Sequence, residues 1–173
     1  MDIKDKARQQ WNGLERILHA IPGFKGYYEK ELRRDADRVQ REFIVTRLRQ
    51  VKSGMNKMLQ AAARAKDFDR LREYDLFVKE LDKNIGAVRY ADGGYSGFFD
   101  LLKIREAELD RAYDHDALIV EAVVSFAAEF KKLAAAPAEP AGLASLREQL
   151  ERIAGLCAQR TELLKGYGQG EGK

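Results

Sequence analysis

The sequence predicts an all-α protein, an antiparallel bundle of about five helices in which the second and fourth are long. Three observations favour this fold class. Apolar residues recur at steps of three and four along most of the 173 residues, which is the spacing of one helix face. Alanine, leucine and the long charged residues that favour helices are abundant. Prolines, which break helices, number only three.

The first two predicted helices are separated by a proline and a glycine. The first covers about residues 4–19, and Pro22 with Gly23 ends it. The second runs from 27 to about 65, with Gly54 in its interior. Because the apolar spacing resumes after this glycine, we expect one continuous helix with a kink or a close helix crossing at Gly54.

Three further helices follow. Asp67 is the expected N-cap of the third helix, which ends at about residue 89. A fourth helix is predicted from about 98 to 133. Residues 134–140 contain two prolines three residues apart, so we expect a linker there. The fifth helix carries its apolar series from Leu143 to Leu164.

Length and composition predict one helical domain, residues 1–166, and a flexible glycine-rich tail, residues 167–173. The formal net charge of +3 says little about partners. Cys157 is the single cysteine, which excludes an intramolecular disulfide and fits a reducing compartment. Neither a signal-peptide core nor a long uninterrupted apolar run is visible. We therefore expect a cytoplasmic protein with no transmembrane segment.

Two stretches rich in glycine and aromatic residues, 21–28 and 90–100, flank the second and third helices. If those helices form a hairpin, both stretches lie at one end of the bundle, which we call the glycine–aromatic pole. Glycines let the backbone approach a ligand closely, and the start of the fourth helix could attract an anion. Alternatively, the aromatic rings plug the open end of the bundle. The candidate ligand- or partner-binding residues are Phe24, Lys25, Tyr27, Arg89, Tyr90, Asp92, Tyr95, Ser96 and Phe98.

Pro22-Gly-Phe-Lys-Gly-Tyr27 and Gly94-Tyr-Ser-Gly-Phe-Phe-Asp100, followed by the run from Glu108 to Asp116, are distinctive segments. In them the chain resembles an uncharacterised bacterial family of predicted all-helical proteins, over about residues 20–120. One departure is Gly93-Gly94-Tyr95, where the family pattern has Tyr-Gly-Tyr, and it makes the turn more flexible. The family has no established activity, so the resemblance implies that the two stretches form a unit and implies no chemistry.

A second candidate is the basic stretch 43–66, which contains no acidic residue. Its basic residues are Arg47, Arg49, Lys52, Lys57, Arg64 and Lys66. Such a stretch could follow the phosphates of a nucleic acid. The segments 67–82 and 100–121 are acidic, however, and the stretch lacks the interleaved aromatics of a stacking platform. Charge neutralisation within the bundle is therefore favoured over nucleic-acid binding.

Arg105 and Asp116 fall on the inward stripe of the fourth helix. A buried charge is costly unless it is paired, so we expect each to meet an opposite charge from another helix. His115 is expected to pair with Asp114, with Asp116 or with a neighbouring helix. Ionisable groups in such places can be catalytic, but structural ion pairs are commoner.

Metal binding and nucleophilic catalysis find no support in the residue spacing. A di-iron bundle needs Glu-x-x-His on each of two helices, and glutamate precedes neither His19 nor His115 by three residues. Cys157 falls on an apolar stripe, where cysteine behaves as a small hydrophobe. No glycine-rich phosphate-binding motif is present either. We therefore expect no metal, no cofactor and no catalytic residue.

These observations favour a non-enzymatic protein-interaction or scaffold bundle that binds another protein through the glycine–aromatic pole or a long helical face. A homo-oligomer is compatible with the same patterns. Two alternatives stay open. One is a small-ligand or enzymatic site at the pole formed by residues 21–28 and 90–100. The other is nucleic-acid binding through residues 43–66.

Overall fold

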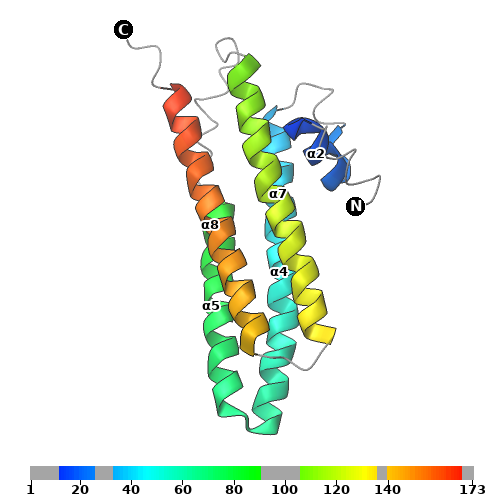
Figure 1. The fold of residues 1–173 in the computed structure, drawn as a ribbon, viewed down its shortest axis with the longest axis vertical. Helices are drawn as coiled ribbons and strands as arrows, with labels where there is room; N and C mark the ends of the chain where they lie inside the picture. Colours follow the sequence, from blue (N-terminus) through cyan, green and yellow to red (C-terminus); the bar gives the residue numbers. More distant parts are fainter. Residues whose placement is uncertain (1–11, 26–32, 91–105, 136–139, 169–173) are drawn as a thin grey trace. The chain divides into compact units, whose positions relative to one another are not determined.

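The computed structural model describes residues 12–25, 33–90, 106–135 and 140–168. This part of the chain contains helices and no strand, so the predicted all-α helical bundle is confirmed. The helices are α2 (Gly13–Ala20), α4 (Arg33–Ala65), α5 (Phe68–Tyr90), α7 (Glu106–Ala135) and α8 (Pro140–Gly168) (Figure 1). Among the described residues, none of these helices combines the length and the apolar run that a membrane crossing needs.

The chain divides into two compact units. Unit 1 comprises Met1–Arg41, Asp92–Glu121 and Gly155–Lys173, and unit 2 comprises Glu42–Ala91 and Ala122–Ala154. All of α2 lies in unit 1 and all of α5 lies in unit 2, whereas α4, α7 and α8 contribute to both. The expected single domain and its tail stay predictions, because residues 169–173 lie outside the described part of the chain.

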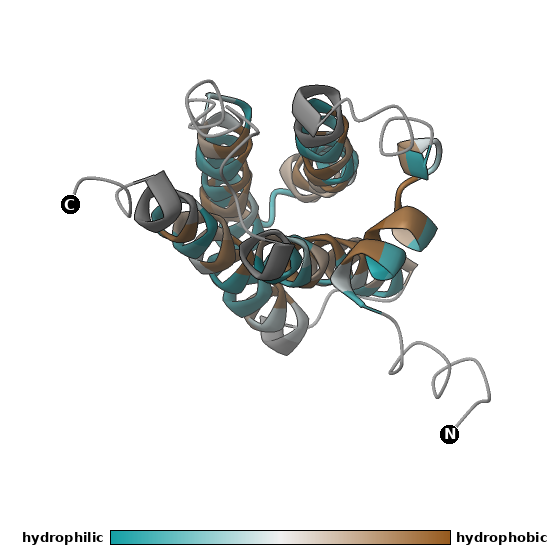
Figure 2. Ribbon diagram, turned by 90° about the horizontal axis from the view of Figure 1, so that it is seen from above, coloured by the Kyte–Doolittle hydropathy of each residue, from teal (hydrophilic) through white to brown (hydrophobic). Residues whose placement is uncertain are grey.

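Unit 2 is built around apolar residues from four helical segments. On α5 the buried residues Tyr74, Phe77, Leu81, Ile85 and Val88 follow steps of three and four, which is why this segment forms an amphipathic helix. Figure 2 shows hydrophobic and hydrophilic residues on different sides of the same helices. The ring of Phe77 lies 6.4 Å from that of Phe126 on α7, at an interplanar angle of 58°. This tilted arrangement is one that aromatic pairs prefer.

Helix α4 continues through Gly54, as the apolar spacing predicts. A Cβ atom at this position would overlap the ring of Phe130 on α7. Glycine therefore removes the side chain that would otherwise hold the two helices apart. The expected continuity of the helix is confirmed, and the room that Gly54 leaves for the Phe130 ring explains why a poor helix former is kept in the middle of α4.

Helices α4 and α5 are joined by only two residues, Lys66 and Asp67 (Figure 1). Lys66 has a left-handed φ of 56°. Its amide donates to the carbonyl of Ala63 at 3.1 Å, and the amide of Asp67 donates to that of Ala62 at 3.0 Å. These two bonds form a Schellman motif, which ends α4. The Asp67 carboxylate then accepts the amide of Arg70 at 3.1 Å, so the predicted N-cap of α5 is confirmed.

Helix α2 of unit 1 begins at a capping box. The amide of Glu15 donates to the side chain of Asn12 and the amide of Asn12 donates to the Glu15 carboxylate, each at 2.9 Å. Because Asn12 is extended, the helix predicted over residues 4–19 does not run unbroken through this position. Residues 1–11 lie outside the described part of the chain. After α2, Gly23 has a left-handed φ of 81°, which fits the predicted turn.

Helix α2 packs directly against the backbone of α7 within unit 1. A Cβ atom at Gly13 would overlap backbone atoms of Tyr113 and Asp114. One turn further on, Arg16 forms ion pairs with Asp114 at 3.5 Å and with Glu121 at 3.4 Å. Gly13 lets α2 lie directly against the α7 backbone, and the long side chain of Arg16 pairs with two acidic residues of α7. Together they hold α2 against α7.

The linker predicted over residues 134–140 is shorter than expected. Helix α7 extends to Ala135 and α8 begins at Pro140, while residues 136–139 lie outside the described residues. The prediction was wrong about Pro140 because proline is well tolerated at the first position of a helix, where no intrahelical amide bond is lost. The predicted beginnings of the second and fourth helices, at 27 and 98, also lie outside the described residues.

Replacing Gly54 by alanine should lower the free energy of unfolding by up to about 2 kcal/mol. A gain in helix propensity of about 1 kcal/mol is outweighed by overpacking against Phe130, which costs about 1–3 kcal/mol. The matched control is Gly86→Ala in α5, where an added Cβ meets no atom within 4 Å. Because only the helix propensity changes there, we expect a gain of about 0.5–1 kcal/mol.

Both variants are compared with the wild type by urea unfolding followed by circular dichroism. Equal stabilisation by Gly54→Ala and Gly86→Ala would contradict a close crossing of α4 and α7.

Candidate functional site

Most of the glycine–aromatic pole lies outside the described residues, so a pocket there stays a prediction. Phe24 is buried in unit 1, and the neighbouring Lys25 is exposed. In unit 2 the guanidinium of Arg89 lies 5.5 Å from the ring centroid of Tyr90, which is 74% exposed. The predicted site residues of which nothing is described are Tyr27, Asp92, Tyr95, Ser96, Phe98 and Arg105.

A buried ion pair joins α7 to α8 within unit 1. Arg160 donates to both carboxylate oxygens of Asp116, with Nη2 lying 3.2 Å from Oδ2. The side chains of Arg160 and Asp116 are 16% and 6% exposed. Asp116 thus lies on the inward side of α7 and meets an opposite charge from another helix. Sequence reasoning missed Arg160, and the only available signal was its place three residues after Cys157, on the edge of the apolar stripe of α8.

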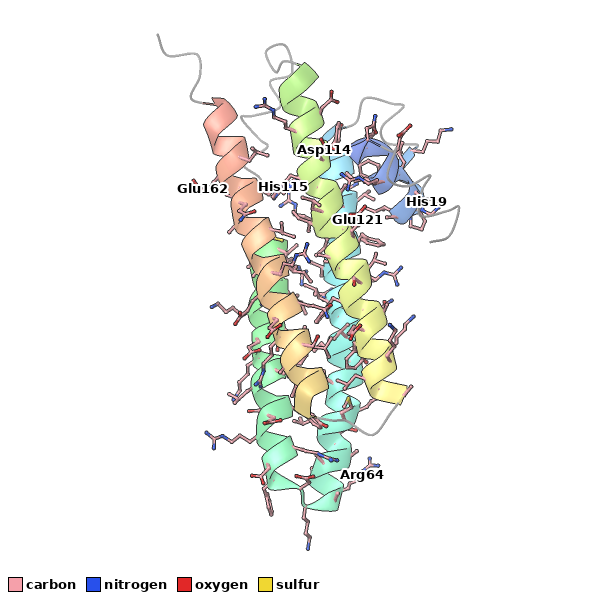
Figure 3. The ribbon with its side chains drawn as sticks, in the orientation of Figure 1. His19, Arg64, Asp114, His115, Glu121 and Glu162 are labelled. Atoms are coloured by element: carbon pink, nitrogen blue, oxygen red, sulfur yellow. The ribbon has the colours of Figure 1, made fainter. Side chains whose placement is uncertain are left out.

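His115 forms the second polar link between α7 and α8. Its Nε2 lies 2.8 Å from the backbone carbonyl oxygen of Leu156, so this ring nitrogen is the donor. Figure 3 shows His115 on the side of α7 that faces α8, whereas Asp114 and Glu121 lie on the side that faces α2. The consecutive residues Asp114, His115 and Asp116 therefore hold α7 against its two neighbours in unit 1.

Cys157 lies close enough to this ion pair for its pKa to be affected. Burial raises the pKa of the thiol to about 11, and the negative charge of Asp116 contributes in the same direction. The thiol is therefore protonated at neutral pH, and a protonated thiol is a poor nucleophile. Among the described residues, no group of three acidic, histidine or cysteine side chains could hold a metal ion.

The basic stretch 43–66 is partly neutralised inside unit 2. Lys52 pairs with Asp82 of α5 at 2.6 Å, as expected if α4 and α5 complement each other in charge. Arg64 lies at the end of α4 next to the turn into α5 (Figure 3). The basic residues of the stretch that are exposed are Arg49, Lys57, Arg64 and Lys66. Nucleic-acid binding through these residues stays a prediction.

The side of α5 opposite its core carries large exposed apolar residues. Phe68 is 73% exposed, Leu76 is 45% exposed and Tyr90 is 74% exposed. At 100° per residue they fall within about 80° of one another on the helix and face away from the core residues. They belong to a series with steps of three and four that we call the outer stripe of α5. Its members are Phe68, Arg72, Leu76, Lys79, Lys83, Gly86 and Tyr90.

The flanks of the outer stripe attach α5 to its neighbours in unit 2. On one flank Asp82 pairs with Lys52 of α4 at 2.6 Å. On the other flank Glu80 lies 3.6 Å from Arg147 of α8, which also donates to the carbonyl of Glu73 at 3.2 Å. Glu80 and Asp82 therefore pair with neighbouring helices, whereas Asp69 and Asp75 lie on the two edges of the outer stripe.

Sequence reasoning missed the outer stripe because it did not separate a second apolar series, which begins at Phe68, from the core residues of α5. The positions of these residues around the helix would have revealed the outer stripe. Phe68, Leu76 and Tyr90 are separated by eight and fourteen residues, which keeps them on one side of a helix, whereas Tyr74 and Leu81 lie on the other.

Comparisons with protein-family models, with curated proteins and with solved structures found no match to this chain.

Removing Asp116 should destabilise the protein much more than removing Asp82. Asp116→Ala removes the bidentate carboxylate from a mostly buried Arg160, and breaking a buried pair costs about 3–5 kcal/mol. Asp82→Ala breaks an exposed pair, which contributes about 0–1 kcal/mol. Urea unfolding measures both changes. Replacing the whole pair, with Asp116→Leu and Arg160→Met, should recover much of the loss. Equal costs for the two single variants would contradict a buried pair.

The raised pKa of Cys157 makes a contribution to stability that depends on pH. The folded state holds the thiol proton more tightly than the unfolded state, so this contribution is complete below the ordinary pKa of 9.0. It is lost as the pH rises toward about 11. Relative to Cys157→Ala, the wild type should lose on the order of 2 kcal/mol of unfolding free energy between pH 8 and pH 10.5. A difference that is constant over this range would contradict the shift.

Proposed function

We propose that this chain is a non-enzymatic helical bundle that binds another protein through the outer stripe of α5. The observation that carries the proposal is the exposure of Phe68, Leu76 and Tyr90 on one side of a helix whose other side is buried. Burying apolar surface is the main favourable contribution to most protein–protein association. Aromatic residues are enriched among those that dominate binding energies.

The polar residues between α7 and α8 in unit 1 support binding rather than catalysis. Asp116 is held by Arg160, the Nε2 of His115 is used on a backbone carbonyl, and the thiol of Cys157 is protonated at neutral pH. A nucleophilic cysteine acts as a thiolate, and the Cys157 thiol is protonated at neutral pH. These groups stabilise the contact of α7 with α8 instead.

Several expectations from the sequence stay part of this proposal. They are a bacterial origin in the family of all-helical proteins that the chain resembles, a cytoplasmic location and a second contact surface at the glycine–aromatic pole. The single Cys157 supports the reducing compartment. A second copy of this chain is also an admissible partner, which would make the protein a homo-oligomer.

Site-specific photo-crosslinking tests the proposal. A benzoylphenylalanine at position 76, in protein expressed in its own organism, should yield a discrete crosslinked product with one partner. The matched control position is Arg152, which is exposed on α8 in the same unit and lies away from the outer stripe. Phe68→Ser and Tyr90→Ser should each reduce the product at position 76 strongly, because truncating an aromatic residue that dominates binding costs about 2 kcal/mol or more.

The same product at positions 76 and 152, or a product insensitive to both serine variants, would count against the outer stripe as the binding surface. The variants must keep the unfolding midpoint of the wild type. We expect this because both replaced side chains are mostly exposed.

A further inference from the structure

Helix α4 has a long exposed side in unit 2, opposite its buried residues. Ile44, Leu48 and Met55 are buried and define its core side. The opposite side, between Thr46 and Arg64, is called the outer face of α4 below. At 100° per residue its members fall within about 120° of one another. They are Thr46, Arg49, Gln50, Ser53, Lys57, Gln60, Ala61 and Arg64, and all of them are exposed.

The outer face of α4 carries cations and hydrogen-bond donors but no carboxylate. Apart from Ala61, each of its residues has a basic, hydroxyl or amide side chain. The nearest acidic residue on the same side of the helix is Glu42, about one turn before the face begins. At the other end, beyond Arg64, Lys66 adds an exposed cation at the turn into α5 (Figure 3). The face is therefore positively charged along its whole length.

Neutralisation by α5 reaches the flank of α4 and not its outer face. Lys52 lies on the flank toward α5 and pairs with Asp82 at 2.6 Å. Asp75, about two turns before Asp82 on the same side of α5, pairs with Lys79 of its own helix at 2.7 Å. Both acids on this side of α5 are thus paired with cations that lie outside the outer face of α4.

Three cations of the outer face of α4 are left without such a partner. Within the part of the chain that the structure describes, none of Arg49, Lys57 and Arg64 forms an ion pair. They follow one another along the helix at about 12 Å and about 10 Å. Ser53 and Gln60 lie between them on the same face. The result is a row of cations that alternates with neutral hydrogen-bond donors.

This pattern fits a phosphate backbone better than a protein or a membrane surface. Contacts to phosphate come from arginine, lysine, serine, threonine and glutamine side chains, which are the types on this face. The centre of a protein interface is rich in aromatic residues, and a helix that lies on a membrane needs an apolar side. The outer face of α4 offers only Ala61 for either purpose. Without an aromatic residue, it has no platform for the stacked bases of a single strand.

We propose that the outer face of α4 binds the sugar–phosphate backbone of a nucleic-acid duplex, irrespective of its sequence. Arg49, Lys57 and Arg64 each meet a phosphate, and the hydroxyl and amide groups between them donate to neighbouring phosphate oxygens. Contacts of this kind hold a duplex but carry no information about its bases. This function is independent of the outer stripe of α5, which belongs to another helix.

Fluorescence anisotropy on the full chain tests the inference. The probes are two fluorescein-labelled DNA duplexes of about 24 base pairs and unrelated sequence, at salt concentrations from about 50 to about 200 mM. The two duplexes should bind equally well. The logarithm of the association constant should fall with the logarithm of the salt concentration at a slope of about −3, because each neutralised phosphate contributes about −0.9.

Charge-neutral variants then locate the binding. Lys57→Gln with Arg64→Gln should make the slope shallower by about 2 and weaken binding at about 50 mM salt by more than tenfold. Lys57→Arg with Arg64→Lys keeps both charges and should keep the slope. The matched control, Lys83→Gln with Arg152→Gln, removes the same net charge from α5 and α8 of the same unit and should leave the slope unchanged. All the replaced residues are exposed, so every variant should keep the unfolding midpoint of the wild type.

Several results would overturn the inference. They are an absence of binding at about 50 mM salt, a slope near zero, and equal losses in the charge-neutral variant and its matched control. Polyglutamate that displaces the duplex at equal charge concentration would assign the face to an acidic protein. Vesicles containing phosphatidylserine that bind the chain when the duplex does not would assign it to a membrane surface. Either assignment excludes the nucleic-acid duplex as the ligand.

Discussion

The crossing of α4 and α7 at Gly54 is the constraint on which the architecture of unit 2 depends. Without a side chain at this position, the ring of Phe130 lies against the α4 backbone. Phe126, one turn earlier on the same side of α7, meets Phe77 of α5. One face of α7 therefore contacts both helices of the α4–α5 hairpin. With Phe77 held inward, the opposite side of α5 must face away from the core.

Charges in this bundle act differently according to where they lie. Asp116 and Arg160 link α7 to α8 in unit 1 through a buried ion pair, which is costly to break. The exposed pairs at the flanks of α5 contribute little energy individually. They direct Glu80 toward α8 and Asp82 toward α4, whereas Asp69 and Asp75 stay beside the outer stripe. Helix α5 carries five acidic and five basic residues in all.

Hydrophobic spacing predicts the core side of α4 and α5, the passage through Gly54 and the cap at Asp67, because these features are local. It cannot identify Arg160 as the partner of Asp116, since that choice depends on how two distant helices rotate against each other. At Asn12 the side chain caps a helix in place of continuing one. The helix predicted over residues 4–19 therefore does not pass unbroken through this extended residue. The outer stripe was missed for a further reason. A helix can carry apolar residues on two sides, and the exposed side is overlooked when every apolar residue is assigned to the core.

The two-residue turn at Lys66 has a consequence for the order of folding. The pair of Lys52 and Asp82 closes across this turn over 30 residues, whereas Arg16 and Asp114 are 98 residues apart. Closing the longer loop costs about 1 kcal/mol more chain entropy. Chain entropy therefore favours closing the contact of α4 with α5 before that of α2 with α7.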